Sequence, residues 1–457
     1  MDKDTPASLE KDQKNEQKPQ ESAAPEYKKD ERILYRLMPA LTFASLEKTW
    51  MATQETEEAP NDKLDYEVGE LVCTCLPAKL ISVTRATNLD GWTECLLTGL
   101  VKRTILETPS FPQSLSQPKK SLHYIADAPA AGEATSKPLT GLHASTSIEM
   151  GDLVFSERPV LIVPASIRIG EIFVEHLSHE EQNRLVMKHW LETLETVFHR
   201  VSKKDQEAFW KLRDIWQKDG KKSIHGIVQT NGFKVTGLED PGLEGNLGMY
   251  SGVCIQMSQI NHSCRPNLER YWDMASFSMQ LRATRKISRG EELTLSFIDQ
   301  LQPFAVRKEK LKQFDIVCSC PSCKKPKIGD MRRKQFIAGS PSTQEFTDWI
   351  KDPTRGDDHI IKRALVQISL LEADGLENSP YYDDCLSTIM LVYITLGDKD
   401  KAMRWGKQLG KWKQCRLGPE SAREYDNPQK YTKHALWKLR VKIVNDMRAT
   451  SYSLGKH

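Results

Sequence analysis

Long apolar runs are missing from the 457 residues of this chain. No segment approaches the roughly 18 consecutive apolar residues of a membrane-spanning helix, so we expect no membrane insertion. The opening residues, MDKDTPASLEKDQKNEQKPQ, also lack the apolar core of a secretory signal peptide. We therefore expect a protein of the nucleus, the cytoplasm or both, and not a secreted one.

An excess of charge of one sign is also missing. The 65 Lys and Arg residues nearly balance the 62 Asp and Glu residues, which gives a net charge of +3 at pH 7. This balance predicts no attraction of the whole protein to nucleic acid. The one basic stretch that could bind nucleic acid, KKPKIGDMRRK at 324–334, is more typical of a solvated linker.

Changes in composition predict the first domain boundaries. Residues 1–32 are mostly charged and polar, which predicts a disordered tail. Residues 33–120 contain strand-like segments and then a linker, TPSFPQSLSQPKKS, and no motif in them assigns a role. Short strands separated by turns are predicted for 121–299. The length leaves room for two or three domains.

Helical periodicity marks two parts of the chain. In an insert at about 170–248, Ser178 and Glu181 have the spacing of a capping box, and apolar residues follow at helical spacing. Residues 335–457 show the same spacing, with Gly397 as a stop signal. A helical repeat module and a plain helical bundle both fit this C-terminal part, because no second copy recurs at a fixed period.

The ten cysteines are read as thiols, because disulfides are rare in a reducing compartment. Cys318, Cys320 and Cys323 form a C-x-C-x-x-C cluster in the segment 300–326, and thiolates this close together can share one cation. Zinc prefers four ligands in a tetrahedron, so one is missing. Spacing alone leaves five candidates for it: Cys254, Cys264, Cys385, Cys415 and His262.

The stretch QINHSCRPNLERYW at 259–272 places an Asn, a His, a Ser and a Cys side by side. The residues by themselves allow a metal site, a nucleophile, a glycosylation acceptor or a buried strand with polar residues. Glycosylation requires secretion, which the opening residues argue against. The other three interpretations stay open at this point.

Three motifs in this order resemble the family of SET-domain protein lysine methyltransferases. They are Asn-His-Ser-Cys-x-Pro-Asn at 261–267, Gly-Glu-Glu-Leu-Thr at 290–294 and Cys-x-Cys-x-x-Cys at 318–323. IHGIVQTNGF followed by SQINHSC is similar to the branch with a helical insert, which includes the SET-and-MYND group and its fungal relatives. The resemblance covers roughly 121–326. A MYND finger is not expected, because 160–250 contains no cysteine.

The resemblance implies an α+β SET fold with short β-sheets, a knot-like threading of the C-terminal segment, a helical insert, a post-SET zinc cluster and a C-terminal α-helical region. It also implies the fourth ligand of a structural zinc site, which would consist of Cys264, Cys318, Cys320 and Cys323. A metal that joins distant positions would hold a tail that lacks a core of its own. As a metal ligand, Cys264 would be a poor nucleophile, which argues against a Cys-His hydrolase.

The activity implied by the resemblance is methyl transfer from S-adenosyl-L-methionine to a lysine of a protein substrate, histone or non-histone. The cofactor-binding positions that it implies are Gly141, Leu142, Ser258, Ile260, Asn261, His262, Phe297 and Ile316. Lysine is a nucleophile only when neutral, and its free pKa is about 10.4. A narrow apolar channel would favour the neutral form, and alignment with the sulfonium would supply further acceleration.

Three positions depart from the family pattern. Phe297 stands at the catalytic position where the family usually has a tyrosine, so the hydroxyl beside the methyl-transfer centre is missing. Leu139 replaces the first glycine of the opening Gly-x-Gly-Leu pattern. Ile316 replaces an aromatic residue before the cysteine cluster, although Phe314 keeps an aromatic ring nearby.

The departures leave two hypotheses. In the first, the chain is an enzyme with Phe297 as a wall of the lysine channel, and Tyr250 or Tyr271 could supply a hydroxyl from elsewhere. In the second, it is a catalytically inactive SET fold that serves as a zinc-stabilised protein-interaction module. The sequence specifies neither the substrate lysine nor the oligomeric state.

Overall fold

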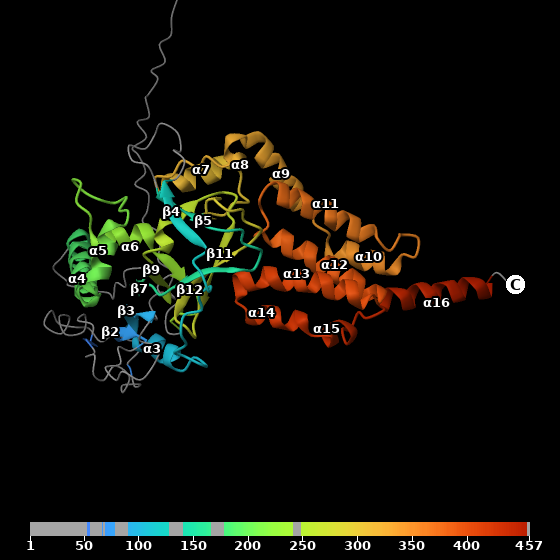
Figure 1. Cartoon of the computed structure of the whole chain (residues 1–457), viewed down its shortest axis with the longest axis horizontal. Coiled ribbons are helices and arrows are strands. Elements are labelled where there is room, and N and C mark those ends of the chain that lie inside the picture. The colour runs from blue at the N-terminus through green and yellow to red at the C-terminus, as the bar shows by residue number, and fades with distance from the viewer. Residues whose placement is uncertain are drawn as a thin grey trace, which may run out of the picture.

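The computed structural model describes residues 53–54, 66, 69–77, 90–127, 140–165, 178–240 and 248–454. A β-rich part and a long helical part lie side by side, with the C-terminal helix projecting away from the β-rich part (Figure 1). The fold class is α+β, as the sequence predicts. The predicted disordered tail, residues 1–32, lies outside the described ranges. Within them, no helix has the length and apolar character to cross a membrane.

The largest sheet has six strands in the order β1-β2-β3-β7-β9-β8. These are β1 (Thr53–Gln54), β2 (Leu71–Leu76), β3 (Thr93–Thr98), β7 (Leu161–Pro164), β9 (Tyr250–Val253) and β8 (Phe233–Val235). Strand β3 pairs in parallel with β7, with Cys95 opposite Ile162. Strands β2 and β3, which come from a region without an assigned role, thus extend the sheet of the SET region. Its continuation, α3 (Gly99–Leu106), packs on β3.

The helical insert covers one face of this sheet. It consists of α4 (His179–Arg200), α5 (Lys203–Lys211) and α6 (Ile224–Asn231). The predicted capping box is confirmed: the Ser178 hydroxyl accepts the Glu181 N–H, and the Glu181 carboxylate accepts the Ser178 N–H. Leu194 and Val197 of α4 pack against Leu96 of β3 and its neighbours.

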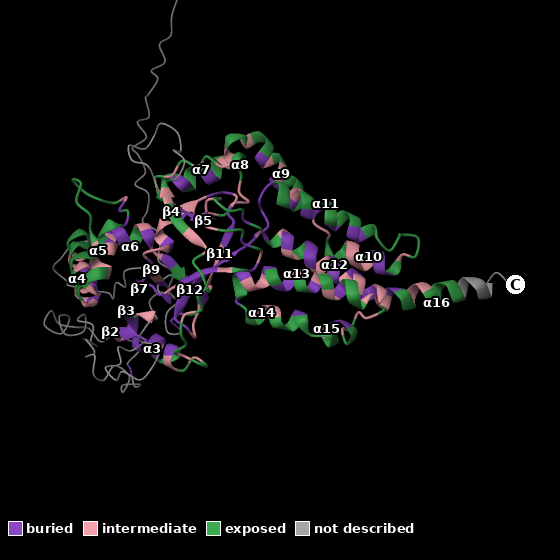
Figure 2. Cartoon of the chain, in the orientation of Figure 1, coloured by how far each residue is buried: buried purple, intermediate pink, exposed green. Residues whose placement is uncertain are grey.

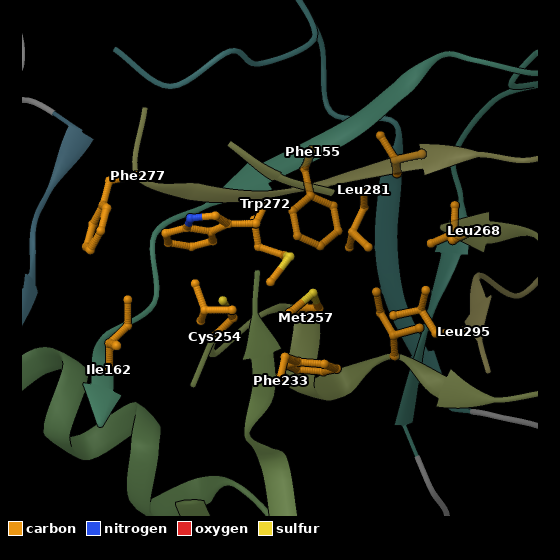
Figure 3. Packing of buried hydrophobic residues seen from close by; sticks show 14 of the residues in the cluster. Phe155, Ile162, Phe233, Cys254, Met257, Leu268, Trp272, Phe277, Leu281 and Leu295 are labelled. Atoms are coloured by element: carbon orange, nitrogen blue, oxygen red, sulfur yellow. The ribbon is translucent and has the colours of Figure 1, made fainter. Parts of the chain in front are cut away.

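The opposite face of the sheet contributes to the main core of the SET region. A second sheet packs there, in the order β11 (Leu268–Asp273), β12 (Ser278–Ala283), β6 (Leu153–Glu157). Figure 3 shows Leu268, Trp272 and Leu281 from this sheet in one core with Phe233 and Met257. A two-stranded sheet of β4 (His123–Asp127) and β5 (Thr140–Ala144) lies beside it.

A short parallel pair brings two of the sequence motifs together. Strand β10 (Asn261–His262) pairs with β13 (Thr294–Leu295), so the Asn-His-Ser-Cys motif lies beside the Gly-Glu-Glu-Leu-Thr motif. The buried Asn267 reinforces the contact: its Oδ1 accepts the Thr294 N–H at 2.8 Å, and its Nδ2 donates to the Glu292 carbonyl at 2.8 Å. A buried amide with both ends bonded fixes the register of the two segments.

Helices form the rest of the chain. They are α7 (Phe304–Lys312), α8 (Pro321–Lys324), α9 (Pro326–Gly339), α10 (Thr343–Lys351), α11 (His359–Ala373), α12 (Pro380–Leu396), α13 (Lys399–Leu417), α14 (Glu420–Arg423), α15 (Pro428–Thr432) and α16 (Leu439–Leu454). Gly397 ends α12 with φ +73°, as the stop signal predicts. Buried faces of α11 to α13 meet in a second core, and their exposed faces point outward (Figure 2).

Glu377, in the turn between α11 and α12, is buried where the helical part meets the SET region. Its carbonyl accepts the Trp412 indole N–H at 2.5 Å, whereas its Oε2 is buried without a hydrogen-bond partner. Burial raises the pKa of this carboxyl from 4.5 to about 7, with Glu372 adding to the rise and Arg285 and Arg265 opposing it. The ionised carboxylate therefore costs stability at neutral pH.

We expect Glu377→Gln to stabilise the protein in a pH-dependent way. Because the pKa is higher in the folded state, the wild-type chain loses stability as the pH rises from about 4.5 to about 7. The variant should therefore match the wild type near pH 4.5 and exceed it at pH 8 by up to about 3 kcal/mol. Denaturant melts across this range test it, with the exposed Glu207→Gln as control. A constant difference at every pH would contradict the assignment.

Candidate functional site

A cleft of about 1670 Å³ lies where three segments of the chain meet. One wall comes from the insert and the start of β8, within residues 208–234. The second contains the Asn-His-Ser-Cys strand, and the third is the cysteine-rich segment 314–324. This volume exceeds the roughly 300–1,000 Å³ of a typical small-molecule pocket. The cleft therefore has room for a nucleotide-sized cofactor together with a side chain of a second ligand.

Most of the predicted cofactor-binding residues line this cleft. Those that do are Ser258, Ile260, Asn261, His262, Phe297 and Ile316. Gly141 and Leu142 are not among the described lining residues, and the Leu142 side chain is fully buried in the core. A Cβ on Gly141 would lie 2.9 Å from Asn261 Nδ2 and 2.8 Å from Glu292 Oε1, so a side chain cannot fit there. Leu139 lies outside the described residues.

The Asn261 side chain is held in one orientation. Its Nδ2 donates to Glu292 Oε1 at 2.8 Å and to the Thr140 carbonyl at 3.3 Å. Because the two N–H groups of the Asn261 amide each have an acceptor, the plane of the amide is fixed. Asn261 is thus a positioned polar group at the edge of the cleft, and Glu292 is its positioning partner.

His262 connects the cleft to the cysteines. The Phe297 N–H donates to His262 Nδ1 at 3.1 Å, and His262 Nε2 lies 3.4 Å from Cys264 Sγ. Burial lowers the pKa of His262 to about 4, so the ring is neutral at physiological pH. Since Nδ1 accepts a hydrogen bond, Nε2 carries the proton and donates a hydrogen bond to the Cys264 sulfur. His262 is therefore a donor to Cys264, not a rival metal ligand.

Aromatic rings form the wall beside His262. The Phe297 ring lies 5.5 Å from the His262 ring and 6.1 Å from the Phe314 ring, centroid to centroid. Tyr250 and Tyr271, the two candidates for a substitute hydroxyl, lie elsewhere: the Tyr250 hydroxyl accepts the Thr98 N–H in the core, and Tyr271 packs against Gly418. Neither of these tyrosines, nor any other, is among the described residues that line the cleft.

The structure brings four cysteine sulfurs together. The Sγ atoms of Cys264, Cys318, Cys320 and Cys323 all lie within 4.8 Å of one another, and Cys323 is 3.6 Å from Cys264. Zinc–sulfur bonds of about 2.3 Å place the sulfurs of a tetrahedral site about 3.8 Å apart. The cluster fits such a site. The other open candidates, Cys254, Cys385 and Cys415, are buried away from it.

Two buried arginines flank the four-cysteine cluster. Arg307 of α7 is fully buried, and its Nη2 lies 3.8 Å from Cys323 Sγ. Arg333 of α9 is also buried and donates to the Cys264 carbonyl at 3.4 Å. Four thiolates around a divalent cation would carry a net charge of −2, which the two guanidinium groups offset in part, since each also pairs with a carboxylate, Asp330 or Asp374. The charge distribution thus matches a metal-bound cluster.

We expect Arg307→Met to weaken metal binding by about 10- to 100-fold, because it removes a charge that balances the thiolates. Competition with a chromophoric chelator measures this directly on the folded protein. Lys308→Met, an exposed neighbour on the same helix, is the matched control. An unchanged metal affinity in the Arg307 variant would show that the guanidinium does not act on the cluster.

Asp374 joins the cysteine-rich segment to the helical part. This buried carboxylate accepts hydrogen bonds from Ser322 at 3.2 Å, Arg332 at 3.0 Å and Arg333 at 3.1 Å. The basic stretch 324–334 is therefore not a solvated linker, because it includes the end of α8 and most of α9, and two of its arginines are paired. No local pattern predicts these roles, because Asp374 lies about 40 residues further along the chain than the two arginines.

Comparison with known proteins agrees with the geometry. Residues 140–298 match the family model described as SET domain. "Histone-lysine N-methyltransferase Smyd1" of Mus musculus is 28% identical over 168 residues, which is 34% of this chain and 31% of the relative. "N-lysine methyltransferase SMYD2-B" of Danio rerio is 36% identical over 203 residues, 41% of this chain and 44% of the relative.

A fungal relative, "Histone-lysine N-methyltransferase set5" of Schizosaccharomyces pombe, is 24% identical over 202 residues, 43% of this chain and 52% of the relative. The matched segments thus span between about a third and a half of the length of these relatives. Residues 140–298 thus form a SET domain, and this part of the chain is similar to SET-domain lysine methyltransferases, as the sequence motifs predict.

Proposed function

We propose that this chain is a protein-lysine N-methyltransferase that uses S-adenosyl-L-methionine. The observation that carries the proposal is the cleft, in which Asn261, His262 and Phe297 meet beside the four-cysteine cluster within a SET domain. The names of the curated relatives agree with this reaction. The proposed substrate is a lysine side chain of a protein, and the proposed location is the nucleus or the cytoplasm.

The lining of the cleft fits the cofactor. S-Adenosyl-L-methionine, when bound, supplies the methyl group on a sulfonium. Asn261 offers a fixed amide for polar contacts, and Gly141 leaves the room that the Asn261 and Glu292 side chains occupy. The Phe297 and Phe314 rings give the cleft an apolar wall that excludes water. An amine beside such a wall is held in its neutral, nucleophilic form.

We propose that the four-cysteine cluster holds a structural zinc ion. Cys264, in the turn after β10, and the three cysteines that follow α7 would hold the ion, which would join the two segments. The cysteine-rich segment forms one wall of the cleft. His262 links this cluster to Phe297, because its ring is hydrogen-bonded to both Cys264 Sγ and the Phe297 N–H. Metal binding to the cluster would therefore stabilise this wall of the cleft.

A second function has one observation in its favour. The described cleft lining includes no tyrosine, so no tyrosine hydroxyl orients the amine or the methyl group. Loss of one well-placed polar contact to a transition state costs about 10²–10³ in rate in comparable cases. An inactive SET fold that binds a protein partner in the same cleft is therefore the alternative.

Transfer of a labelled methyl group tests the proposal. The full-length, zinc-loaded chain is incubated with labelled S-adenosyl-L-methionine and a mixture of histone and non-histone proteins, and labelled lysines are identified by mass spectrometry. Asn261→Ala should abolish the signal at an unchanged melting temperature. Absence of label with every protein, despite bound cofactor, would favour the inactive module.

A further inference from the structure

Arg270 occupies an unusual position in β11. Side chains alternate between the two faces of a strand, and the neighbours on its face, Leu268 and Trp272, are both buried in the core of the SET region (Figure 3). The other face, which carries Tyr271, meets the C-terminal helices. Arg270 thus places a permanent charge on the strand face that is otherwise apolar.

The guanidinium of Arg270 opens into the cleft. Its Cζ lies 5.3 Å from the centre of the Phe233 ring, and both residues line the cleft. No described carboxylate forms an ion pair with it, and no described acceptor takes a hydrogen bond from its guanidinium. Burial lowers its pKa, yet an arginine stays charged in proteins. The residue is only partly buried, so its guanidinium is accessible to a ligand in the cleft.

The remaining charges of the cleft leave Arg270 without a counter-charge. The described lining has four acidic side chains, and each already accepts hydrogen bonds within the chain: Asp214, Glu291, Glu292 and Asp315. Among the basic side chains of the same lining, Lys211 and Lys324 also form no ion pair with a described residue. Asp214 and Glu292 accept only from neutral groups, but the described lining has eight Lys and Arg side chains against four acidic ones, so its net charge is positive.

We propose that Arg270 binds a carboxylate of the substrate, so that the cleft selects lysines flanked by Asp or Glu. This inference rests on the proposed function, because it takes the cleft as the substrate-binding site. The planar guanidinium can hold a carboxylate through two parallel hydrogen bonds. The Phe233 ring packs against the guanidinium and restricts its orientation. Lys211 and Lys324 attract further acidic residues at the rim. A strongly basic segment is repelled by the same charges.

Two fluorescent 13-residue peptides test the proposal. Each has one central lysine, and its flanking positions carry either four Glu or four Gln residues. Binding to the full-length, zinc-loaded chain is followed by anisotropy with S-adenosylhomocysteine present. The Glu peptide should bind at least about tenfold more tightly, and the difference should shrink as salt is added. Equal affinities at low salt would overturn the proposal.

Matched variants assign the effect to Arg270. Arg270→Gln should lose most of the difference between the peptides, and Arg270→Lys should keep part of it. Arg404→Gln, which changes an exposed arginine of α13 away from the cleft, should behave like the wild type. Arg270→Leu should melt at or above the wild-type temperature, because it completes the apolar strand face. A lower melting temperature with unchanged peptide selectivity would assign Arg270 a purely structural role.

Cofactor titrations separate the two sources of a carboxylate. Arg270→Gln should bind S-adenosyl-L-methionine as the wild type does. A loss of cofactor affinity with unchanged peptide selectivity would place the carboxylate of the cofactor at Arg270 and overturn the proposal. Selective peptide binding without any methyl transfer would instead leave this inference standing and contradict the proposed enzyme.

Discussion

Replacement of Cys320 by serine is expected to release the metal and to unfold the wall of the cleft. Four sulfurs lie within 4.8 Å of one another, and the segment that carries three of them has few other buried apolar contacts. Structural zinc sites contribute on the order of 10 kcal/mol to folding in small domains. We expect a loss of at least about 4 kcal/mol of stability here, since the rest of the chain keeps its own cores.

Metal content and thermal melting measure the effect of this change. The wild type should contain one zinc per chain and Cys320→Ser almost none, with the melting temperature lowered accordingly. Cys415→Ser is the matched control, because the buried Cys415 donates to the Ala283 carbonyl and a serine hydroxyl can do the same. An unchanged zinc content and an unchanged melting temperature in the Cys320 variant would show that the four cysteines do not form a metal site.

Phe297→Tyr is expected to raise methyl transfer by about 10- to 100-fold. The Phe297 ring lines the cleft beside His262 and Phe314, and its backbone N–H is held by His262. A tyrosine in this position keeps the aromatic wall and adds a hydroxyl to a site whose described lining has none. One well-placed polar contact is worth about 10²–10³ in rate at comparable centres.

Single-turnover rates with a labelled cofactor measure this gain. Phe346→Tyr, at a half-buried ring in α10, repeats the same chemical change far from the cleft and should leave the rate unchanged. An active wild type with no gain from Phe297→Tyr would mean that another group already orients the amine. Cofactor binding without turnover in both proteins would support the inactive module.

The sequence predicted much of the site, because the family motifs are local. Asn261, His262, Cys264 and the C-x-C-x-x-C cluster are each recognised within a few residues, and the structure brings all of them together. The helical insert and the stop at Gly397 followed from capping and periodicity. Capping residues and helical periodicity involve residues only a few positions apart, so the sequence alone can predict them.

Other features depend on contacts between distant parts of the chain. Strand β3 joins the SET sheet through β7, more than 60 residues further along the sequence, and no local signal marks that pairing. The buried arginines at 307 and 333 looked like ordinary surface charges, because their partners come from other segments. Alternation along the strand places Arg270 on the face of Leu268 and Trp272, but only the folded chain shows that it lines the cleft.

Calorimetric titration of the zinc-loaded, full-length protein with S-adenosyl-L-methionine tests the central claim most directly. The account predicts one binding site per chain with micromolar affinity, lost in Asn261→Ala. Absence of binding heat by a folded protein with its full zinc content would contradict the account, because the cleft would then hold no cofactor.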